Sequence, residues 1–210
     1  MGTGEKTMTP PLPRCLFLDI GMVLVGLNYA PLAEKMRSLA GIEPAQLQTV
    51  LTAENLVQGY ETGKVTEAEF YEEVCRRIGT RIPRADFLDA WYAIFEQPLI
   101  PDEWLATLAQ RVPLWVLSNT NKLHFEFMTR RYTFLSHFEG FVLSHEVGFL
   151  KPDERIFRIA LARVQARAPE VLFVDDQDAN VTAARAVGID AFRFLNPGQF
   201  AAEMKARGLL

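Results

Sequence analysis

The sequence has few of the features that mark secreted, membrane-spanning or nucleic-acid-binding proteins. It holds only two cysteines, Cys15 and Cys75, which form neither a disulfide framework nor a metal-ligand spacing. Its 26 acidic residues outnumber its 22 basic ones, and the net charge of −4 leaves no surplus of cations for a nucleic-acid backbone. No apolar run reaches the length of a membrane span. We therefore expect a cytoplasmic protein with reduced thiols, and neither nucleic acid nor a membrane as its partner.

The first residues also lack the apolar centre of a signal peptide. "MGTGEKTMTPPLPR" is instead rich in glycine, threonine and proline, which predicts a flexible tail over residues 1–13. The 210 residues are enough for one sizeable domain, or for a core domain that carries a smaller insertion.

Short apolar runs alternate with helical patterns along much of the chain. Continuous apolar runs of four or five residues suit strands that are buried on both faces. Strands that alternate with helices predict an α/β fold, with a Rossmann-like parallel sheet and helices on both of its faces. Pro152 suits the first turn of one helix. The predicted strands are 15–19, 113–119, 138–144, 170–176 and 190–195, and the predicted helices are 102–111, 122–132, 152–166, 178–187 and 198–207.

Residues 28–98 break this alternation, because their pattern is helical throughout. Thr66 followed by Glu69 predicts a capped helix start. We expect a small helical cap domain at 28–98, inserted after the first strand into a core domain of residues 14–27 and 99–210. A dimer interface is the alternative role for this insertion, and the oligomeric state stays open. The predicted helices of the insertion are about 30–40, 44–53, 66–79 and 84–96.

Three of the apolar runs end in polar residues. The first ends in Asp19, the second in Ser118 and Asn119, and the fourth in Asp175 and Asp176. Ligands of an open parallel sheet bind beyond the carboxyl ends of its strands, so neighbouring strands would bring these groups into one crevice. For each residue alone, capping of the next loop or helix is the simpler interpretation. Three coincident positions, one of them with two adjacent carboxylates, favour a site.

Such a site would have a coherent chemistry. Asp19 and one of the two adjacent aspartates could hold Mg²⁺, which prefers oxygen ligands and often bridges to a phosphate. The Ser118 hydroxyl and free backbone N–H groups could donate hydrogen bonds to phosphate oxygens. Lys151, directly before a predicted helix, could neutralise the remaining charge, although a lysine in such a place is more often a solvated loop residue.

These residues resemble the four short motifs of the haloacid dehalogenase superfamily. The superfamily has an Asp after the first strand, a Ser or Thr after the second, a Lys before a helix and acidic residues after the fourth strand. The sequence is similar to the branch of the α-glucose-1-phosphatases and of the N-terminal phosphatase domain of soluble epoxide hydrolases. The resemblance implies a Mg²⁺-dependent hydrolase of small phosphorylated metabolites. The matching segments are "LFLDIGMVLV", "WVLSNTNKLHF", "SHEVGFLKPDERIF" and "VLFVDDQDANVTAA".

The resemblance also implies a role for each matching residue. Asp19 would be the nucleophile that forms an aspartyl-phosphate. It would also be a metal ligand, together with Asp176 and the backbone carbonyl of Gly21. The helical cap would close over the site, exclude water and select the substrate. Ser118, Asn119 and Lys151 would bind the phosphoryl group, Lys151 would offset its charge, and Asp175 and Asn180 would form an outer layer that positions Lys151 and metal-bound water.

Gly21 departs from the superfamily pattern. Phosphatases of the superfamily usually carry a second Asp two residues after the nucleophile, which protonates the leaving group and then activates water. General acid–base catalysis is worth about 10²–10⁴ in rate, so its loss predicts a slower enzyme rather than an inactive one. The loss matters least for good leaving groups. A sugar 1-phosphate would suit the site, and aryl or anomeric phosphates should react faster than primary alkyl phosphates.

Three alternatives stay open. Another residue could supply the proton, namely His124, His145 or Tyr29, although a lone histidine in such a place is more often structural. A metal-free 2-haloacid dehalogenase also lacks the second Asp, but two adjacent carboxylates beside its nucleophile would repel it without a cation. A catalytically impaired binding protein would have no need of the intact Asp19, Lys151 and Asp176.

Overall fold

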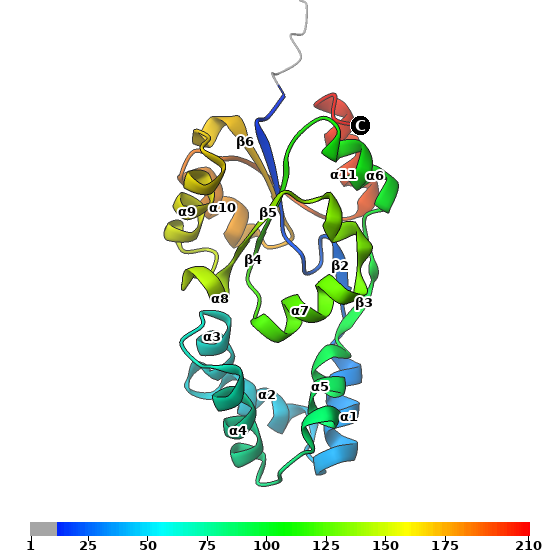
Figure 1. Ribbon diagram of the computed structural model, residues 1–210, viewed down its shortest axis with the longest axis vertical. Coiled ribbons are helices and arrows are strands. Elements are labelled where there is room, and N and C mark those ends of the chain that lie inside the picture. The colour runs from blue at the N-terminus through cyan, green and yellow to red at the C-terminus, as the bar shows by residue number, and fades with distance from the viewer. Residues whose placement is uncertain (1–11) are drawn as a thin grey trace, which may run out of the picture.

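The computed structural model describes residues 12–210 (Figure 1). The predicted tail of residues 1–13 therefore lies outside the described residues, apart from its last two positions. Five parallel strands form one sheet, with the first strand of the chain at its centre. In spatial order they are β5 (Gly140–Leu143), β4 (Leu114–Ser118), β1 (Cys15–Leu18), β6 (Val171–Asp175) and β7 (Asp190–Arg193).

The sheet is buried on both faces because its strands are almost entirely apolar. In β1, Leu16 and Leu18 belong to one hydrophobic cluster and Phe17 belongs to another, as expected for side chains that alternate between faces. The two layers of helices lie on opposite sides of the sheet in Figure 1. One layer holds α9 (Glu154–Val164) and α10 (Asp178–Ala186), and the other holds α6 (Asp102–Ala109), α7 (Lys122–Arg131) and α11 (Pro197–Ala206).

This part of the molecule confirms the predicted α/β fold. All five strands and all five helices occur, with ends that differ from the expected ones by no more than two residues. The expectation for Pro152 is wrong, because α9 begins at Glu154 and Asp153 caps it by accepting a hydrogen bond from the Arg155 N–H. The proline lies before the helix, in the turn that carries Lys151. The sequence patterns missed the four-residue helix α8 (Ser144–Val147) and the 3₁₀ turns η2 (Thr133–His137) and η3 (Ala168–Glu170).

The remaining helices, which we call the helical module, pack around a hydrophobic core of their own. Phe70 and Trp91 lie in this core with ring centroids 4.9 Å apart. Thr66 and Glu69 form the predicted capping box, in which each side chain satisfies the other's backbone N–H. The module consists of α1 (Ala30–Ala40), α2 (Pro44–Thr52), the 3₁₀ turn η1 (Ala53–Asn55), α3 (Leu56–Glu61), α4 (Glu67–Ile78) and α5 (Arg84–Tyr92).

Two short antiparallel strands connect the helical module to the rest of the chain, which we call the sheet module. They are β2 (Val25–Leu27) and β3 (Phe95–Pro98). The prediction of helices alone over 28–98 is therefore wrong at its end, and it also missed α3. Since the returning chain runs beside β2, the backbone of Phe95–Pro98 pairs there instead of continuing α5. The expected domain boundaries at 27/28 and 98/99 place the paired strands β2 and β3 in different domains. These boundaries stay a proposal.

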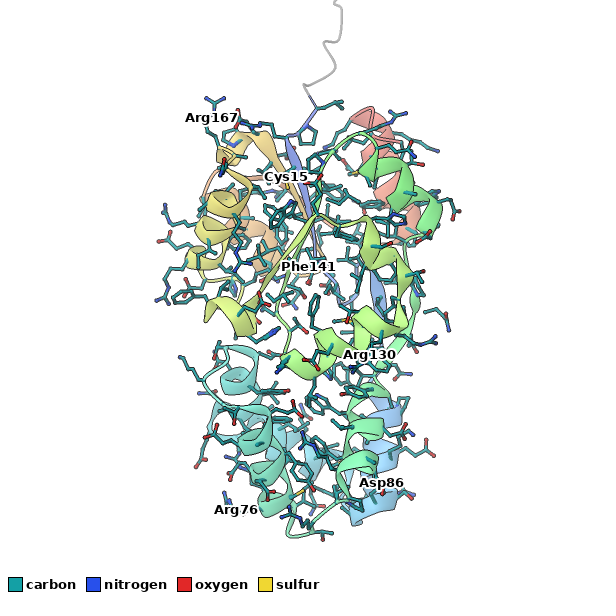
Figure 2. The ribbon with its side chains drawn as sticks, in the orientation of Figure 1. Cys15, Arg76, Asp86, Arg130, Phe141 and Arg167 are labelled. Atoms are coloured by element: carbon teal, nitrogen blue, oxygen red, sulfur yellow. The ribbon has the colours of Figure 1, made fainter. Side chains whose placement is uncertain are left out.

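The helical module lies against the sheet module at two places, α3 on α8 and α5 on α7. On α7, the Leu123 N–H donates to the Tyr60 hydroxyl at 3.3 Å, and the His124 ring stacks on Trp91. Arg130, labelled in Figure 2, is on the same helix and lies beside this junction. At the other contact, a Cβ on Gly63 would stand 2.4 Å from the carbonyl oxygen of His145. Only glycine permits this close approach.

Two expectations about the chain as a whole can be compared with the described residues. No helix within residues 12–210 is long and apolar enough to cross a membrane. Cys15 and Cys75 are both buried and unpaired, as expected for reduced thiols.

Gly63→Ala should move the two modules apart, since the added methyl group would collide with the His145 carbonyl. Small-angle scattering should show a larger radius of gyration, and the thermal unfolding temperature should fall. Gly41→Ala is the matched control, because Gly41 has the same positive φ (+67° against +68°) but open space around its Cβ position. The control should lose only the about 1–2 kcal/mol that a left-handed backbone costs alanine. Equal radii and equal stabilities in the two variants would contradict a closed contact at Gly63.

Candidate active site

The polar residues singled out in the sequence gather at the carboxyl ends of three neighbouring strands. Asp19 follows β1, Ser118 ends β4 and Asp175 ends β6. Strand β1 lies between the other two and pairs with both in parallel. Positions that are far apart in the chain therefore meet at one edge of the sheet, as the strand-end pattern predicted.

Lys151 lies at the centre of this cluster and is 4% exposed. Its Nζ is 3.0 Å from Asp19 Oδ1 and 2.6 Å from Asp175 Oδ2, and it donates to the Leu117 carbonyl at 2.8 Å. The Asn119 side chain holds the backbone of the lysine from both sides, donating to its carbonyl at 2.9 Å and accepting from its N–H at 2.8 Å. Lys151 is therefore not a solvated loop residue.

Asp175 is fully buried, and both of its carboxylate oxygens have partners. Oδ2 accepts from Lys151, and Oδ1 accepts from the Gln177 N–H and from Asn180 Nδ2, both at 2.9 Å. The other side-chain atom of Asn180, Oδ1, is buried and has no hydrogen-bond partner among the described residues. A buried acceptor without a partner is unusual in a folded protein and indicates a donor, such as a water, at this point.

The cluster carries more negative than positive charge. Burial raises the pKa of Asp19 to about 6, with Lys151 opposing the shift and Asp175 adding to it. Burial also raises the pKa of the half-buried Asp176, again with a contribution from Asp175. Burial alone would lower the pKa of Lys151, but Asp19 and Asp175 together raise it, so this side chain stays cationic. One lysine among three carboxylates leaves an excess negative charge that a bound cation would offset.

The three carboxylates suit a hard divalent cation such as Mg²⁺, which prefers oxygen ligands. Oxygen atoms of Asp19, Asp175 and Asp176 lie within 4.8 Å of one another. Because Asp175 already has three hydrogen-bond partners, Asp19 and Asp176 are the two carboxylates free to bind a cation. No hydrogen bond in the turn at residues 20–25 uses the Gly21 carbonyl, which leaves it available as a third oxygen. The unpartnered Asn180 Oδ1 could accept from a metal-bound water.

Ser118 and Asn119, the two residues on β4 and its loop that are predicted to bind the phosphoryl group, differ in which of their hydrogen-bond donors are available. The Ser118 hydroxyl interacts with Asp19, where it favours the ionised carboxylate. The side-chain amide of Asn119 is occupied by Lys151, so only its backbone N–H could reach a phosphoryl group. Both residues line the cavity described below.

Gly21 lies in a tight turn in which the Ile20 carbonyl accepts from three successive N–H groups. A Cβ at Gly21 would lie 2.8 Å from Leu27 Cδ1. The Leu27 side chain therefore covers the side of Gly21 from which a side chain would project. Where the aspartate side chain of other phosphatases would project, this protein has the apolar side chain of Leu27.

A cavity of about 150 Å³ lies between the modules, directly above this edge of the sheet. Its floor includes Ile20, Gly21, Ser118 and Asn119, so it opens onto the candidate site. Its walls are mostly apolar and come largely from the helical module. The apolar lining residues are Ile20, Leu27, Leu32, Leu51, Val57, Trp91, Ile94, Phe95 and Met128.

Glu61, the last residue of α3, also lines this cavity and was not singled out from the sequence. Burial raises its pKa to about 7, and the negative charge of Asp19 adds to the shift. In the sequence this glutamate stands in a turn-like segment between two predicted helices, where an acidic residue carries no signal. Only its place in the cavity distinguishes it from the other glutamates of the module.

The other residues considered as proton donors have different environments. His124 lines the cavity, but both of its ring nitrogens have partners at 3.1 Å, Asn121 Nδ2 and the Trp91 carbonyl. Burial lowers its pKa to about 4, so it is neutral. His145 has its Nδ1 against the Thr120 carbonyl. Tyr29 is 61% exposed, with its pKa raised above the ordinary value by burial of part of its ring.

The sheet topology and this acidic cluster define the class, a Rossmann-like enzyme with its site at the carboxyl edge of the sheet. The chain matches the family model described as haloacid dehalogenase-like hydrolase over residues 31–188. It therefore belongs to the haloacid dehalogenase-like hydrolases, as the sequence motifs predicted.

Curated relatives in this family include enzymes of different substrate chemistry. The chain is 28% identical to sesquiterpene phosphatase astK of Aspergillus oryzae over 84% of this chain and 87% of that protein. It is 28% identical to drimenol cyclase drtB of Aspergillus calidoustus over 86% of this chain, but it spans only 34% of that longer protein. It is 24% identical to D-ribitol-5-phosphate phosphatase of Bacteroides thetaiotaomicron over 71% of this chain and 76% of that one.

Solved structures confirm the fold. A HAD-like family hydrolase from Porphyromonas gingivalis superposes with a TM-score of 0.79 at 26% identity, over 93% of this chain and 97% of that one. A HAD family enzyme from Bacteroides thetaiotaomicron, in complex with magnesium and inorganic phosphate, has a TM-score of 0.79 at 22% identity, over 88% and 95% of the two chains.

Lys151→Met should lower the free energy of unfolding by about 3–5 kcal/mol near pH 7.5, because two buried carboxylates lose their cationic partner. Burial already raises the pKa of Asp19 in the folded protein, and without the opposing lysine this pKa rises further, so ionisation of Asp19 opposes folding more strongly as pH rises. The deficit measured by urea unfolding should therefore shrink towards pH 5. Lys205→Met, at an exposed position on α11, is the control and should change stability by no more than about 0.5 kcal/mol. A deficit that is the same at both pH values would contradict the buried pairing.

Proposed function

We propose that the protein is a Mg²⁺-dependent phosphomonoester hydrolase that acts through an aspartyl-phosphate on Asp19. The observation that carries the proposal is the buried lysine between two aspartates, with Asp176 completing a set of oxygen ligands beside them. A nucleophile, a fixed cation and a place for a divalent ion are the parts that phosphoryl transfer requires.

In this mechanism Asp19 attacks phosphorus with the carboxylate oxygen that does not face Lys151. Lys151 offsets the negative charge of the phosphoryl group and of the carboxylate, and its fixed position adds no reorganisation cost. The Ser118 hydroxyl and the Asn119 backbone N–H donate to the phosphoryl oxygens, while the Asn119 side chain keeps Lys151 in place. Asp175 and Asn180 form the outer layer.

A Mg²⁺ ion would be held by Asp19, Asp176 and the Gly21 carbonyl. When bound, it supplies the positive charge that lets the phosphoryl group approach a carboxylate. The Bacteroides enzyme of similar fold, which holds magnesium and inorganic phosphate, supports this arrangement. The helical module would act as the cap, since it covers the site and walls off the cavity above it.

Asp19→Asn should abolish Mg²⁺-dependent hydrolysis of 4-nitrophenyl phosphate, because the amide is not a nucleophile. Excess EDTA should stop the wild type, and Mg²⁺ should raise the melting temperature of wild type but not of Asp176→Asn. Equal inactivity of wild type and Asp19→Asn would favour a binding protein. Release of chloride from a 2-chloro acid in EDTA would favour a metal-free dehalogenase.

We further propose that the carbon part of the substrate is apolar. Sugar hydroxyl groups need hydrogen-bond partners when water is excluded, and the cavity offers few, since His124 and the Thr120 N–H are already occupied. An apolar groove of about 530 Å³ adjoins the cavity and shares Tyr29, Leu32 and Leu51 with it, which gives a longer chain room to continue. The similarity to a sesquiterpene phosphatase supports this class of substrate. A sugar 1-phosphate stays the alternative that the sequence predicted.

An isoprenyl monophosphate should be hydrolysed with a higher kcat/KM than glucose 1-phosphate. Leu51→Gln should lower kcat/KM for the isoprenyl substrate about tenfold or more, through lost apolar contact, and leave 4-nitrophenyl phosphate nearly unchanged. Leu39→Gln, on the same module but outside the cavity, is the control. A preference for glucose 1-phosphate that survives Leu51→Gln would overturn the apolar class.

A further inference from the structure

Glu61 is the only carboxylic acid among the described residues that line the cavity. It comes from the helical module, whereas the nucleophile Asp19 belongs to the sheet module. Ile20 and Gly21, the two residues that follow Asp19 in the chain, line the same cavity, and the charge of Asp19 contributes to the raised pKa of Glu61. Glu61 therefore lines the cavity from the helical module, whereas the groups of the sheet module line it from the strand ends.

The surroundings of Glu61 raise its pKa to about 7, so a substantial fraction of this carboxyl group is protonated at neutral pH. The cavity walls are largely apolar, and within residues 12–210 Glu61 forms no ion pair with a basic side chain. The titratable groups that face it are Asp19 after β1 and Tyr29 before α1, while His124 on α7 stays neutral. A carboxyl group in an apolar pocket that faces a second, ionised carboxylate is the arrangement that separates an acid from a nucleophile.

The segment around Glu61 is fixed in the closed arrangement. The turn that follows α3 presses against α8, where Gly63 meets the His145 carbonyl. The Thr62 N–H and hydroxyl both bond to the Gln58 carbonyl, which holds the end of α3. Glu61 therefore enters the site only when the helical module is closed on the sheet module.

We propose that Glu61 transfers the proton that the carboxyl group missing at position 21 would transfer, and thereby serves as a catalytic acid and base supplied by the helical module. This inference rests on the proposed phosphatase function. With glycine at position 21 and the Leu27 side chain packed over it, the turn itself offers no acid for the leaving group.

The two steps balance in atoms and charge. In the first, an Asp19 oxygen bonds to phosphorus, the bond from phosphorus to the ester oxygen breaks, and the Glu61 proton passes to that oxygen, which leaves as the alcohol. In the second, a water oxygen bonds to phosphorus, its proton passes to the Glu61 carboxylate, and the bond from phosphorus to Asp19 breaks. Phosphate is released, and Asp19 and protonated Glu61 are restored.

This assignment changes what Gly21 implies for the choice of substrate. With an acid in the site, a poor leaving group such as the alkoxide of an apolar alcohol can depart as a neutral alcohol. The wild type would then not be restricted to aryl or anomeric phosphates. The restriction to good leaving groups becomes the property expected of a variant without the acid.

The test compares Glu61→Gln with wild type on a primary alkyl phosphate and on 4-nitrophenyl phosphate, with Mg²⁺ present. The kcat/KM for the alkyl ester, which reports only the first step, should fall by about 10²–10⁴, whereas that for the aryl ester should fall less than about tenfold, because nitrophenolate leaves without a proton. The kcat should fall for both esters, since both pass through the same second step, in which Glu61 is the base. The wild-type kcat/KM for the alkyl ester should decline as pH rises through about 7, and Glu61→Gln should lose this decline. Equal losses of kcat/KM on both esters, or no loss on either, would overturn the inference.

Two further variants distinguish a catalytic role of Glu61 from a structural one. Glu34→Gln, at an exposed position on α1, should leave both activities unchanged. Glu61→Asp keeps an acid and should hydrolyse the alkyl ester faster than Glu61→Gln does, and no such rescue would count against the inference. The raised pKa of Glu61 means that its ionisation opposes folding as pH rises, so Glu61→Gln should raise the melting temperature more at pH 8 than at pH 5.

The outcomes separate the two proposals. A wild type without Mg²⁺-dependent activity on either ester would remove the proposed function, and this inference with it. An active wild type whose Glu61→Gln variant loses kcat/KM equally on both esters would remove only the assignment of Glu61.

Discussion

The buried ammonium group of Lys151 is the constraint on which the rest of the site depends. A charge that is out of contact with water is tolerated only when oppositely charged and hydrogen-bonding groups surround it. Here Asp19, Asp175 and the Leu117 carbonyl provide those groups, and Asn119 holds the lysine backbone. Three neighbouring strands and the turn before α9 must all be in register for this to occur. The order β4, β1, β6 is therefore a requirement of the site as well as a property of the fold.

The same cluster has an excess of negative charge, which a bound cation would offset. Asp175 is committed to Lys151 and to Asn180, whereas Asp176 is half-buried. A cluster without net charge would be a structural feature that does not attract a cation. One with an unbalanced carboxylate next to a buried one attracts a cation, and membership of the haloacid dehalogenase-like hydrolases agrees with this use.

The site is assembled from two modules with different tasks. In the proposed mechanism the sheet module supplies the groups that act on phosphorus, in a polar and tightly hydrogen-bonded cluster. The helical module supplies an apolar cavity and one acid, Glu61. Because the acid and the cavity walls arrive together, closure of the module would exclude water, position the substrate and complete the proton transfer at once. If Glu61 transfers the proton as proposed, the helical module replaces the carboxyl group that Gly21 lacks.

The sequence by itself determined most of the fold and the groups at its carboxyl edge. Buried parallel strands produce apolar runs, and polar residues at their ends stand out against them, so Asp19, Ser118 and Asp175 could be found by pattern. Strand β3 and helix α3 could not be predicted in this way. Their short segments have weak patterns of their own, and they take their form from β2 and from α8 alongside.

Only the tertiary structure decided which of these groups share the site and which are already occupied. The sequence did not show that Asn119 binds the Lys151 backbone, that Leu27 covers Gly21, or that both nitrogens of His124 have partners. It also gave no reason to single out Glu61. The chemistry of a carboxyl group depends on the charges and the solvent around it, and those are set by residues that are distant in the chain and adjacent only after folding.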